Sequence, residues 1–188
     1  MTAVVALLLV NGTLGAADTL WYHEWKVRLP ARPGPFRLEL ALHAGRDAVY
    51  VVVYGSLGWV AWTGRATPVL VGLLGAEIVI TLVDFVVEDR LRPAIGGMAA
   101  GERMLHSAMA IVYGAMLAQL VPILAGWWGA DGGLQPHTDQ APPLWMAVIA
   151  SVLAAGIALS GLRDAVAAAR TLRPRGRRGP SRPPAPRR

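Results

Sequence analysis

The sequence predicts an all-α, polytopic membrane helix bundle with five transmembrane helices. Of the 188 residues, 54% are hydrophobic and only 16% are charged, and the mean hydropathy is positive. A soluble domain of this length has too little interior to bury so much apolar surface, whereas a bilayer covers it directly. A helix needs about 20 apolar residues, at a rise of about 1.5 Å each, to cross the hydrocarbon core. The chain contains five apolar stretches of about this length.

The five predicted helices follow one another with short connections between them. They cover residues 2–22, 40–62, 68–87, 104–128 and 143–162. The connections hold Pro and Gly clusters, which interrupt helices, at residues 30–35, 64–68, 93–101 and 129–143. Residues 1–170 are therefore expected to form a single transmembrane helical domain. In residues 171–188 Arg alternates with Pro and Gly, so we expect a disordered cytoplasmic tail there.

The first apolar stretch has a second interpretation, which the sequence leaves open. Residues 4–10, followed by Gly15, Ala16 and Ala17, are also typical of a signal peptide with a small-residue cleavage site. A signal peptide begins with a positively charged region, however, and the first basic residue of this chain is Lys26. A first transmembrane helix is the favoured interpretation.

The distribution of basic residues predicts the orientation in the membrane. One face receives most of them: Lys26, Arg28, Arg32, Arg37, Arg90, Arg92, Arg103, Arg163, Arg170 and the arginines of the tail. The opposite face carries Arg65, Asp131 and Asp139. Because Lys and Arg stay on the cytoplasmic side, we expect the N-terminus outside and the C-terminus inside the inner (plasma) membrane. The net charge of +6 belongs mostly to the tail, which we expect to contact anionic lipid headgroups and not nucleic acid.

Acidic residues and histidines on four of the predicted helices fall at one depth, near the cytoplasmic face. They are Asp18 on the first helix, Glu39, His43 and Asp47 on the second, Asp84 and Glu88 on the third, and Glu102 and His106 on the fourth. Positions four apart on a helix lie about 40° from each other, so each set forms a stripe. Ionisable groups inside a membrane face the bundle interior, because each is costly against lipid. On the first helix, His23 and Glu24 point away from this interior unless the helix is distorted.

Closely spaced buried carboxylates require protons, arginine partners or bound cations. Carboxylates with two imidazoles suit divalent iron, manganese or zinc, and the chain has no Cys to supply thiolates. We therefore predict a dinuclear metal site at the cytoplasmic membrane face. Its predicted ligands are Asp18, His43, Asp47, Asp84, Glu88, Glu102 and His106. An ion-paired polar core and charges at the membrane interface are the alternatives, because Arg46, Arg90, Arg92 and Arg103 lie on the same side.

The pattern resembles the ferritin-like di-iron carboxylate proteins at the level of the motif. Those proteins place Glu on two helices of a bundle and Glu-x-x-His on the other two. Here the second helix carries Glu39-x-x-x-His43 and the fourth carries Glu102-x-x-x-His106, with a spacing of four where the family has three. The resemblance implies four helices around two metals, iron by preference, with the fifth helix at the periphery or at a homo-oligomer contact. It also implies an oxidoreductase acting on a lipid-soluble or quinone-like substrate.

Glu77 lies on the same face of the third helix as Asp84, about 10 Å deeper in the membrane. We expect it to act as a catalytic base or in a proton path beside the metals. Two other functions stay open. The chain could be a small proton- or metal-ion transporter, for which Glu77 is the best support. It could also be a non-catalytic or haem-binding subunit, with His43 and His106 as axial ligands.

Overall fold

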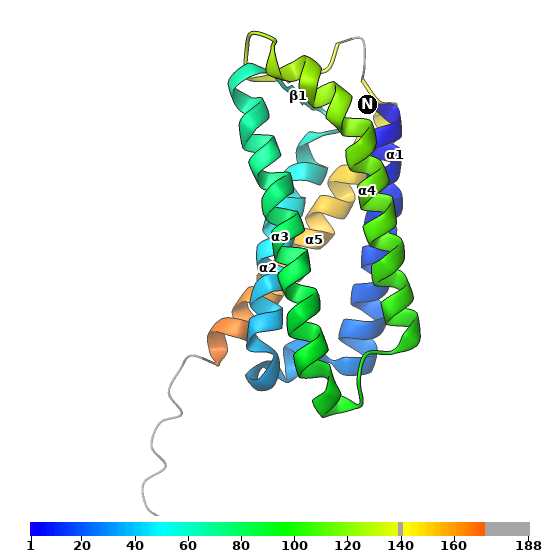
Figure 1. Cartoon of the computed structure of the whole chain (residues 1–188), viewed down its shortest axis with the longest axis vertical. Helices are drawn as coiled ribbons and strands as arrows, with labels where there is room; N and C mark the ends of the chain where they lie inside the picture. The colour runs from blue at the N-terminus through cyan, green and yellow to red at the C-terminus, as the bar shows by residue number, and fades with distance from the viewer. Residues whose placement is uncertain (139–140, 172–188) are drawn as a thin grey trace, which may run out of the picture.

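The computed structural model describes residues 1–138 and 141–171, so Asp139 and most of the predicted tail, residues 172–188, lie outside the described residues. Within them the chain forms an elongated helical bundle (Figure 1). Its α-helices are α1 (Thr2–Asp18), α2 (Pro33–Ser56), α3 (Thr67–Leu91), α4 (Ala100–Trp128) and α5 (Leu144–Arg170). The prediction of an all-α bundle is confirmed.

Among the described residues, four helical segments are long and apolar enough to cross a membrane. They are Thr2–Val27, Gly64–Ile95, Ala100–Trp128 and Leu144–Arg170. The predicted second span, which corresponds to α2, is not among them. Its sequence includes Arg37, Glu39, Arg46 and Asp47, and these charges lower its hydropathy. α2 packs against α5 and α3, so neighbouring helices cover much of its surface.

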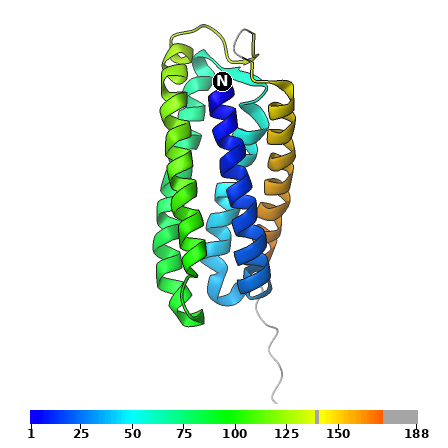
Figure 2. The ribbon, with the colours of Figure 1, turned by 90° about the vertical axis from the view of Figure 1, so that its right-hand side faces the viewer.

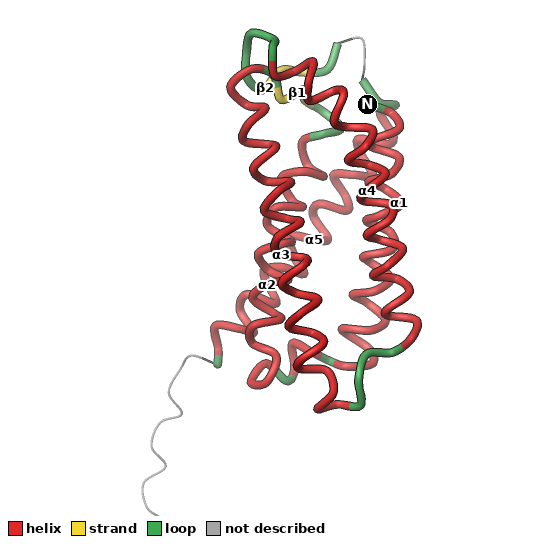
Figure 3. Tube along the Cα trace, viewed as in Figure 1, coloured by secondary structure: helices red, strands yellow, loops and turns green. Residues whose placement is uncertain are grey.

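A short antiparallel sheet closes the end of the bundle at which the chain begins (Figure 3). Strand β1 (Val60–Trp62) pairs with β2 (Leu134–Pro136), with Ala61 opposite Gln135. The prediction that the second helix continues to residue 62 is therefore wrong. α2 ends at Ser56, just before Gly58, where a Cβ atom would lie only 2.9 Å from Cα of Ala147.

The sequence led us to expect a peripheral fifth helix, and the structure contradicts this expectation. α5 packs along α2 and also contacts α1, and Figure 2 shows it running beside α1 for much of its length. Three small residues at intervals of seven, Ala147, Ala154 and Gly161, face α2. A Cβ atom on Gly161 would lie 2.7 Å from Cβ of Asp47, so this contact depends on glycine. Small residues allow helix backbones to approach closely.

The apolar core lies in the part of the bundle nearer the sheet. Leu8, Val53, Leu70, Met116 and Leu120 are buried there in one cluster. Toward the opposite end the inward positions become polar, on α1, α2, α3 and α4 alike. The candidate site lies at that end.

Candidate metal centre

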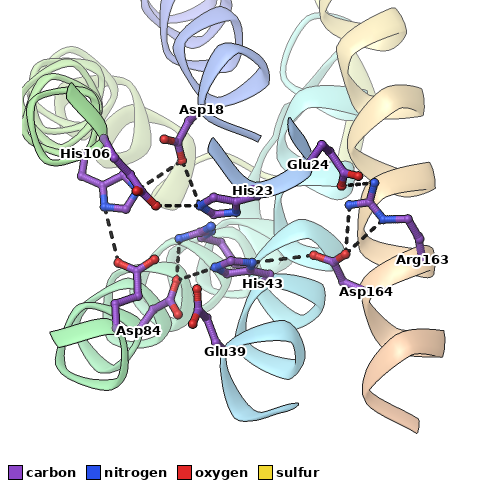
Figure 4. Close-up of polar contacts among 12 residues, drawn as sticks. Asp18, His23, Glu24, Glu39, His43, Asp84, His106, Arg163 and Asp164 are labelled. Carbon is purple, nitrogen blue, oxygen red and sulfur yellow. Dashed lines mark hydrogen bonds and ion pairs between the residues drawn. The ribbon is translucent and has the colours of Figure 1, made fainter. Parts of the chain in front are cut away.

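Side chains from five helices converge where α1 and α3 end and α2 and α4 begin (Figure 4). Eight charged or imidazole groups there are at most 5% exposed: Asp18, His23, Glu39, His43, Asp84, Glu88, Arg92 and Glu102. The side chain of His106 is 12% exposed. Burial of this many ionisable groups is costly unless they pair with one another or with a cation.

A π-helix brings His23 into this cluster. Beyond Asp18 the chain continues as a π-helix from Thr19 to Val27, which ends at Arg28 in the left-handed conformation, with φ of 57°. In an α-helix two residues five apart point about 140° away from each other, whereas π-helical bonds join residues five apart. His23 Nε2 therefore lies 3.4 Å from Asp18 Oδ2. The sequence allowed this position only for a distorted helix, and the structure contains that distortion.

Two groups of side chains offer ligand atoms close enough together to hold a metal ion. The first group consists of His23, Glu88, Glu102 and His106, and the second of Glu39, His43 and Glu88. In each group the ligand atoms all lie within 4.8 Å of one another. Glu88 belongs to both groups. It is fully buried, and neither of its carboxylate oxygens makes a hydrogen bond to any described residue.

Several other buried atoms in the cluster also lack hydrogen-bond partners among the described residues. They are Asp18 Oδ1, His23 Nε2, Glu39 Oε2, His43 Nε2, Asp84 Oδ1 and Glu102 Oε1. Buried polar atoms without partners are rare in folded proteins, and an ion that is not represented is one explanation for them. Carboxylate oxygens and imidazole nitrogens are also the donor atoms of iron, manganese and zinc sites. The residues present therefore fit a metal ion.

Two carboxylates each lie next to one ring nitrogen of a histidine in these groups. Asp18 Oδ2 is 3.1 Å from Nε2 of His106, whose Nδ1 faces Glu88 at 3.5 Å. Asp164 Oδ2 on α5 is 3.7 Å from Nδ1 of His43, whose Nε2 carries no hydrogen bond. In metal sites a carboxylate commonly orients a histidine by accepting a hydrogen bond from the ring nitrogen that does not bind the metal. Asp18 and Asp164 are positioned for this role.

Two arginines supply positive charge to the cluster. Nη2 of Arg92 donates a hydrogen bond of 2.6 Å to Glu39 Oε1 and lies 3.2 Å from Glu102 Oε1. Nη1 of Arg46 donates to Asp84 Oδ2 at 3.1 Å. Against them stand five buried carboxylates: Asp18, Glu39, Asp84, Glu88 and Glu102. Asp164 has a partner of its own, Arg163, at 3.0 Å. The remaining negative charge requires protons on the carboxylates or histidines, or a bound cation.

The structure brings together most of the predicted ligands. His43, Glu88, Glu102 and His106 belong to the two groups. Asp18 lies next to His23, and Asp84 lies 3.2 Å from Nε2 of His43. Asp47 lies apart from both groups and packs against Gly161 of α5. Eight residues separate Asp47 from Glu39, which turns its side chain by about 80° along the helix.

A second polar layer lies two helical turns deeper in the bundle. Asn11, Tyr50, Glu77 and Tyr113 each stand seven residues from a cluster residue on the same helix, namely Asp18, His43, Asp84 and His106. The Tyr50 hydroxyl donates a hydrogen bond of 2.6 Å to Glu77 Oε1, and Thr81 donates another of 2.9 Å to the same atom. Glu77 is 3% exposed, so its deep, inward position agrees with the prediction.

A cavity of about 750 Å³ connects the second layer with the cluster. All five helices line it, with Asn11, Tyr113 and Glu77 at one level and Asp18 and His106 at the other. Most of its remaining walls are apolar, including Leu82, Phe85 and Ile157. Volumes of this order hold drug-sized molecules.

Comparisons with known proteins do not identify this site. No family model matches the chain, and no solved structure matches it. The chain is similar to 2-C-methyl-D-erythritol 4-phosphate cytidylyltransferase of Xylella fastidiosa (strain 9a5c), with 33% identity over 144 residues, or 68% of this chain. It spans 62% of the length of that protein. The chemistry of the cluster is inferred from its geometry.

Proposed function

We propose that this chain is an integral membrane metalloprotein that holds two divalent transition-metal ions and oxidises a lipid-soluble substrate. The observation that carries the proposal is the position of Glu88. It belongs to both ligand groups, and both of its oxygens are buried without hydrogen bonds. A carboxylate in this situation suits a bridge between two metal ions. The first ion would be held by His23, Glu88, Glu102 and His106, and the second by Glu39, His43 and Glu88.

Iron is the proposed metal, with manganese and zinc as alternatives. Imidazole and carboxylate ligands suit all three ions, and the resemblance to ferritin-like proteins favours iron. Bound iron would supply the redox chemistry. The protein would orient His106 through Asp18 and His43 through Asp164, at 3.1 and 3.7 Å. The class of reaction rests on analogy with soluble di-iron proteins.

Ion pairing alone accounts less well for the cluster. Arg92 lies nearest to Glu39 and Glu102 but 3.7 Å from the Oε1 atom of Glu88. Glu88 is therefore ion-paired with Arg92 through Oε1, but neither of its buried oxygens accepts a hydrogen bond from a described residue. A haem between His43 and His106 is also disfavoured, because the His23 ring lies beside both, with centroids 4.8 and 6.4 Å away.

The proposed location is the inner membrane, with the N-terminus outside, the metal centre at the cytoplasmic face and α2 as a fifth span. Large apolar side chains on the outer surface support insertion, among them Ile111 and Leu159, which are 73% and 71% exposed. Trp21 and Trp25 are exposed near Lys26 at the end of the bundle that holds the cluster. Aromatic and basic residues gather in this way at membrane interfaces.

Metal analysis of the purified full-length chain tests the proposal. After expression with added iron, manganese or zinc, we expect close to two metal equivalents per chain. His43→Ala and His106→Ala should each remove much of the metal. The matched control is His137→Ala, because His137 lies beside the sheet and bonds the carbonyl oxygen of Leu57. Metal-free wild-type protein from all three growths would refute the proposal, and a single equivalent would refute the dinuclear centre.

Ion transport is a second candidate, supported by the buried Glu77 on a wall of the cavity. Glu77 and its partners Tyr50 and Thr81 could pass protons or cations along the bundle. Beyond this layer the bundle is filled by the apolar core, which includes Leu70, Met116 and Leu120. A polar path across the outer half is therefore missing among the described residues, and oxidation is the preferred function.

A further inference from the structure

We propose that the cavity binds a molecule with an apolar body and one hydrogen-bonding oxygen, a phenol or long-chain alcohol, with the oxygen held at the second polar layer. That this molecule is the substrate rests on the function proposed above. The binding itself does not depend on the metals.

In the second polar layer, two buried polar atoms on the cavity wall lack hydrogen-bond partners among the described residues. Asn11 and Tyr113 are 4% and 8% exposed, and both line the cavity. Neither Asn11 Oδ1 nor the Tyr113 hydroxyl makes a hydrogen bond within the described part of the chain. The amide oxygen can only accept a hydrogen bond, whereas the phenol can donate or accept one. A ligand hydroxyl, which does both, satisfies either group.

The neighbouring tyrosine hydroxyls of the layer already donate hydrogen bonds within the protein. Tyr50 donates to Glu77, and Tyr54 donates to the backbone oxygen of Leu8 at 2.9 Å. The rings of Tyr50 and Tyr113 pack edge to face, with centroids 6.2 Å apart. These contacts hold the Tyr113 ring in place, so its hydroxyl forms a preorganised contact for a ligand oxygen.

The cavity opens through the side of the bundle. Four of its lining residues are themselves more than half exposed: Leu20, Leu82, Val152 and Leu159, at 67%, 58%, 65% and 71%. In a bilayer these side chains face lipid tails. A lipid-soluble molecule could therefore enter sideways from the membrane.

The inner wall of the cavity adjoins the candidate metal centre. His106 lines the cavity and stacks on Phe85, another lining residue, with ring centroids 5.6 Å apart. Seven residues of helix, about 10 Å, separate His106 from Tyr113. A ligand whose oxygen contacts Tyr113 would thus extend its apolar body toward the metal ligands.

The test compares three probes in nanodiscs of dioleoyl phosphatidylcholine. They are para-octylphenol, its methyl ether and octylbenzene, which differ only in the polar group. Saturable binding of the radiolabelled probes is measured against empty nanodiscs, with both metal-loaded and chelator-treated protein. We expect para-octylphenol to bind best. Tyr113→Phe should weaken it about fivefold, the effect of one net hydrogen bond, and leave octylbenzene unchanged.

A second pair of variants tests the cavity itself. Gly114 lines the cavity, and a Cβ atom there would meet nothing within 4 Å. Gly114→Leu should therefore fold and abolish binding of all three probes. Gly126 is equally open on the same helix but does not line the cavity, so Gly126→Leu should bind normally.

The outcomes separate this inference from the proposed function. Absence of saturable binding to metal-loaded protein would refute the ligand site and leave the metal centre intact. Normal binding by Gly114→Leu, or equal weakening of all three probes by Tyr113→Phe, would also refute it. Binding that depends on Tyr113 in a protein that proves metal-free would support the ligand site and refute the oxidation.

Discussion

Replacement of Glu88 by Gln should have opposite effects on the metal-loaded and metal-free protein. The substitution keeps the shape of the side chain but removes its negative charge and one oxygen ligand. Because the amide keeps one oxygen, the change removes a single donor, either one of four from the first group or one of three from the second. We therefore expect the metal content to fall from about two equivalents to one or fewer, with the second site affected most.

The magnitudes follow from the coupling of binding to stability. A metal at a free concentration of 100 times its Kd stabilises the folded protein by about 2.7 kcal/mol per site. For a chain of this length, loss of one such site should lower Tm by roughly 5–10 °C. Without metal, both oxygens of Glu88 are buried and make no hydrogen bond, so a neutral amide should raise stability by about 1–3 kcal/mol.

The assay is thermal unfolding of the detergent-solubilised protein with excess metal and with chelator, together with metal analysis. Glu39→Gln and Glu102→Gln are the matched controls, because each carboxylate belongs to only one group. Each should lose metal from its own site alone. A Glu88→Gln protein that kept two equivalents, or that was destabilised equally with and without metal, would contradict the bridging role.

Three other perturbations test separate parts of the structure. Gly161→Ala should destabilise the protein by about 1–3 kcal/mol, because the added Cβ atom would meet Asp47. Gly156→Ala is the control and should be neutral, because a Cβ atom there meets nothing within 4 Å. Equal unfolding temperatures of the two variants would show that α5 and α2 pack differently. Glu77→Gln should retain metal while turnover falls, if the protein is an oxidoreductase, and should abolish proton- or cation-coupled flux in liposomes if it is a transporter. Reporters fused at the C-terminus and inserted at Gly132 should read cytoplasmic and external, and the same side for both would refute five spans.

The periodic features of the site were predictable from the sequence. On α2, α3 and α4 the inward groups recur every four residues, as in Glu102 and His106, and such stripes follow directly from α-helical geometry. The position of His23 was not predictable in this way, because a π-helix changes which residues share a face. No residue pattern in Thr19–Val27 indicates that geometry.

Contacts between distant segments account for the other differences. Asp164 was missed because α5 was expected at the periphery, and its small residues at 147, 154 and 161 did not reveal their close fit against α2. Arg92 was assigned to the orientation signal, to an ion-paired core without a named partner or to the membrane interface. In the structure it is 1% exposed and bonds Glu39, 53 positions away in the sequence. Pairing of this kind depends on tertiary structure, which the local sequence does not encode.

The arrangement of α2 has a consequence for the biogenesis of the protein. This helix lacks the apolar character of the other four. Its most extensive partner is α5, which is synthesised after the other four described helices. Until α5 arrives, one flank of α2 has no helix to cover it, and His43 lacks its neighbour Asp164. A chain truncated before Leu144 should therefore be retained by the insertion machinery or degraded. Completion of the metal centre would then depend on the packing of α5 against α2.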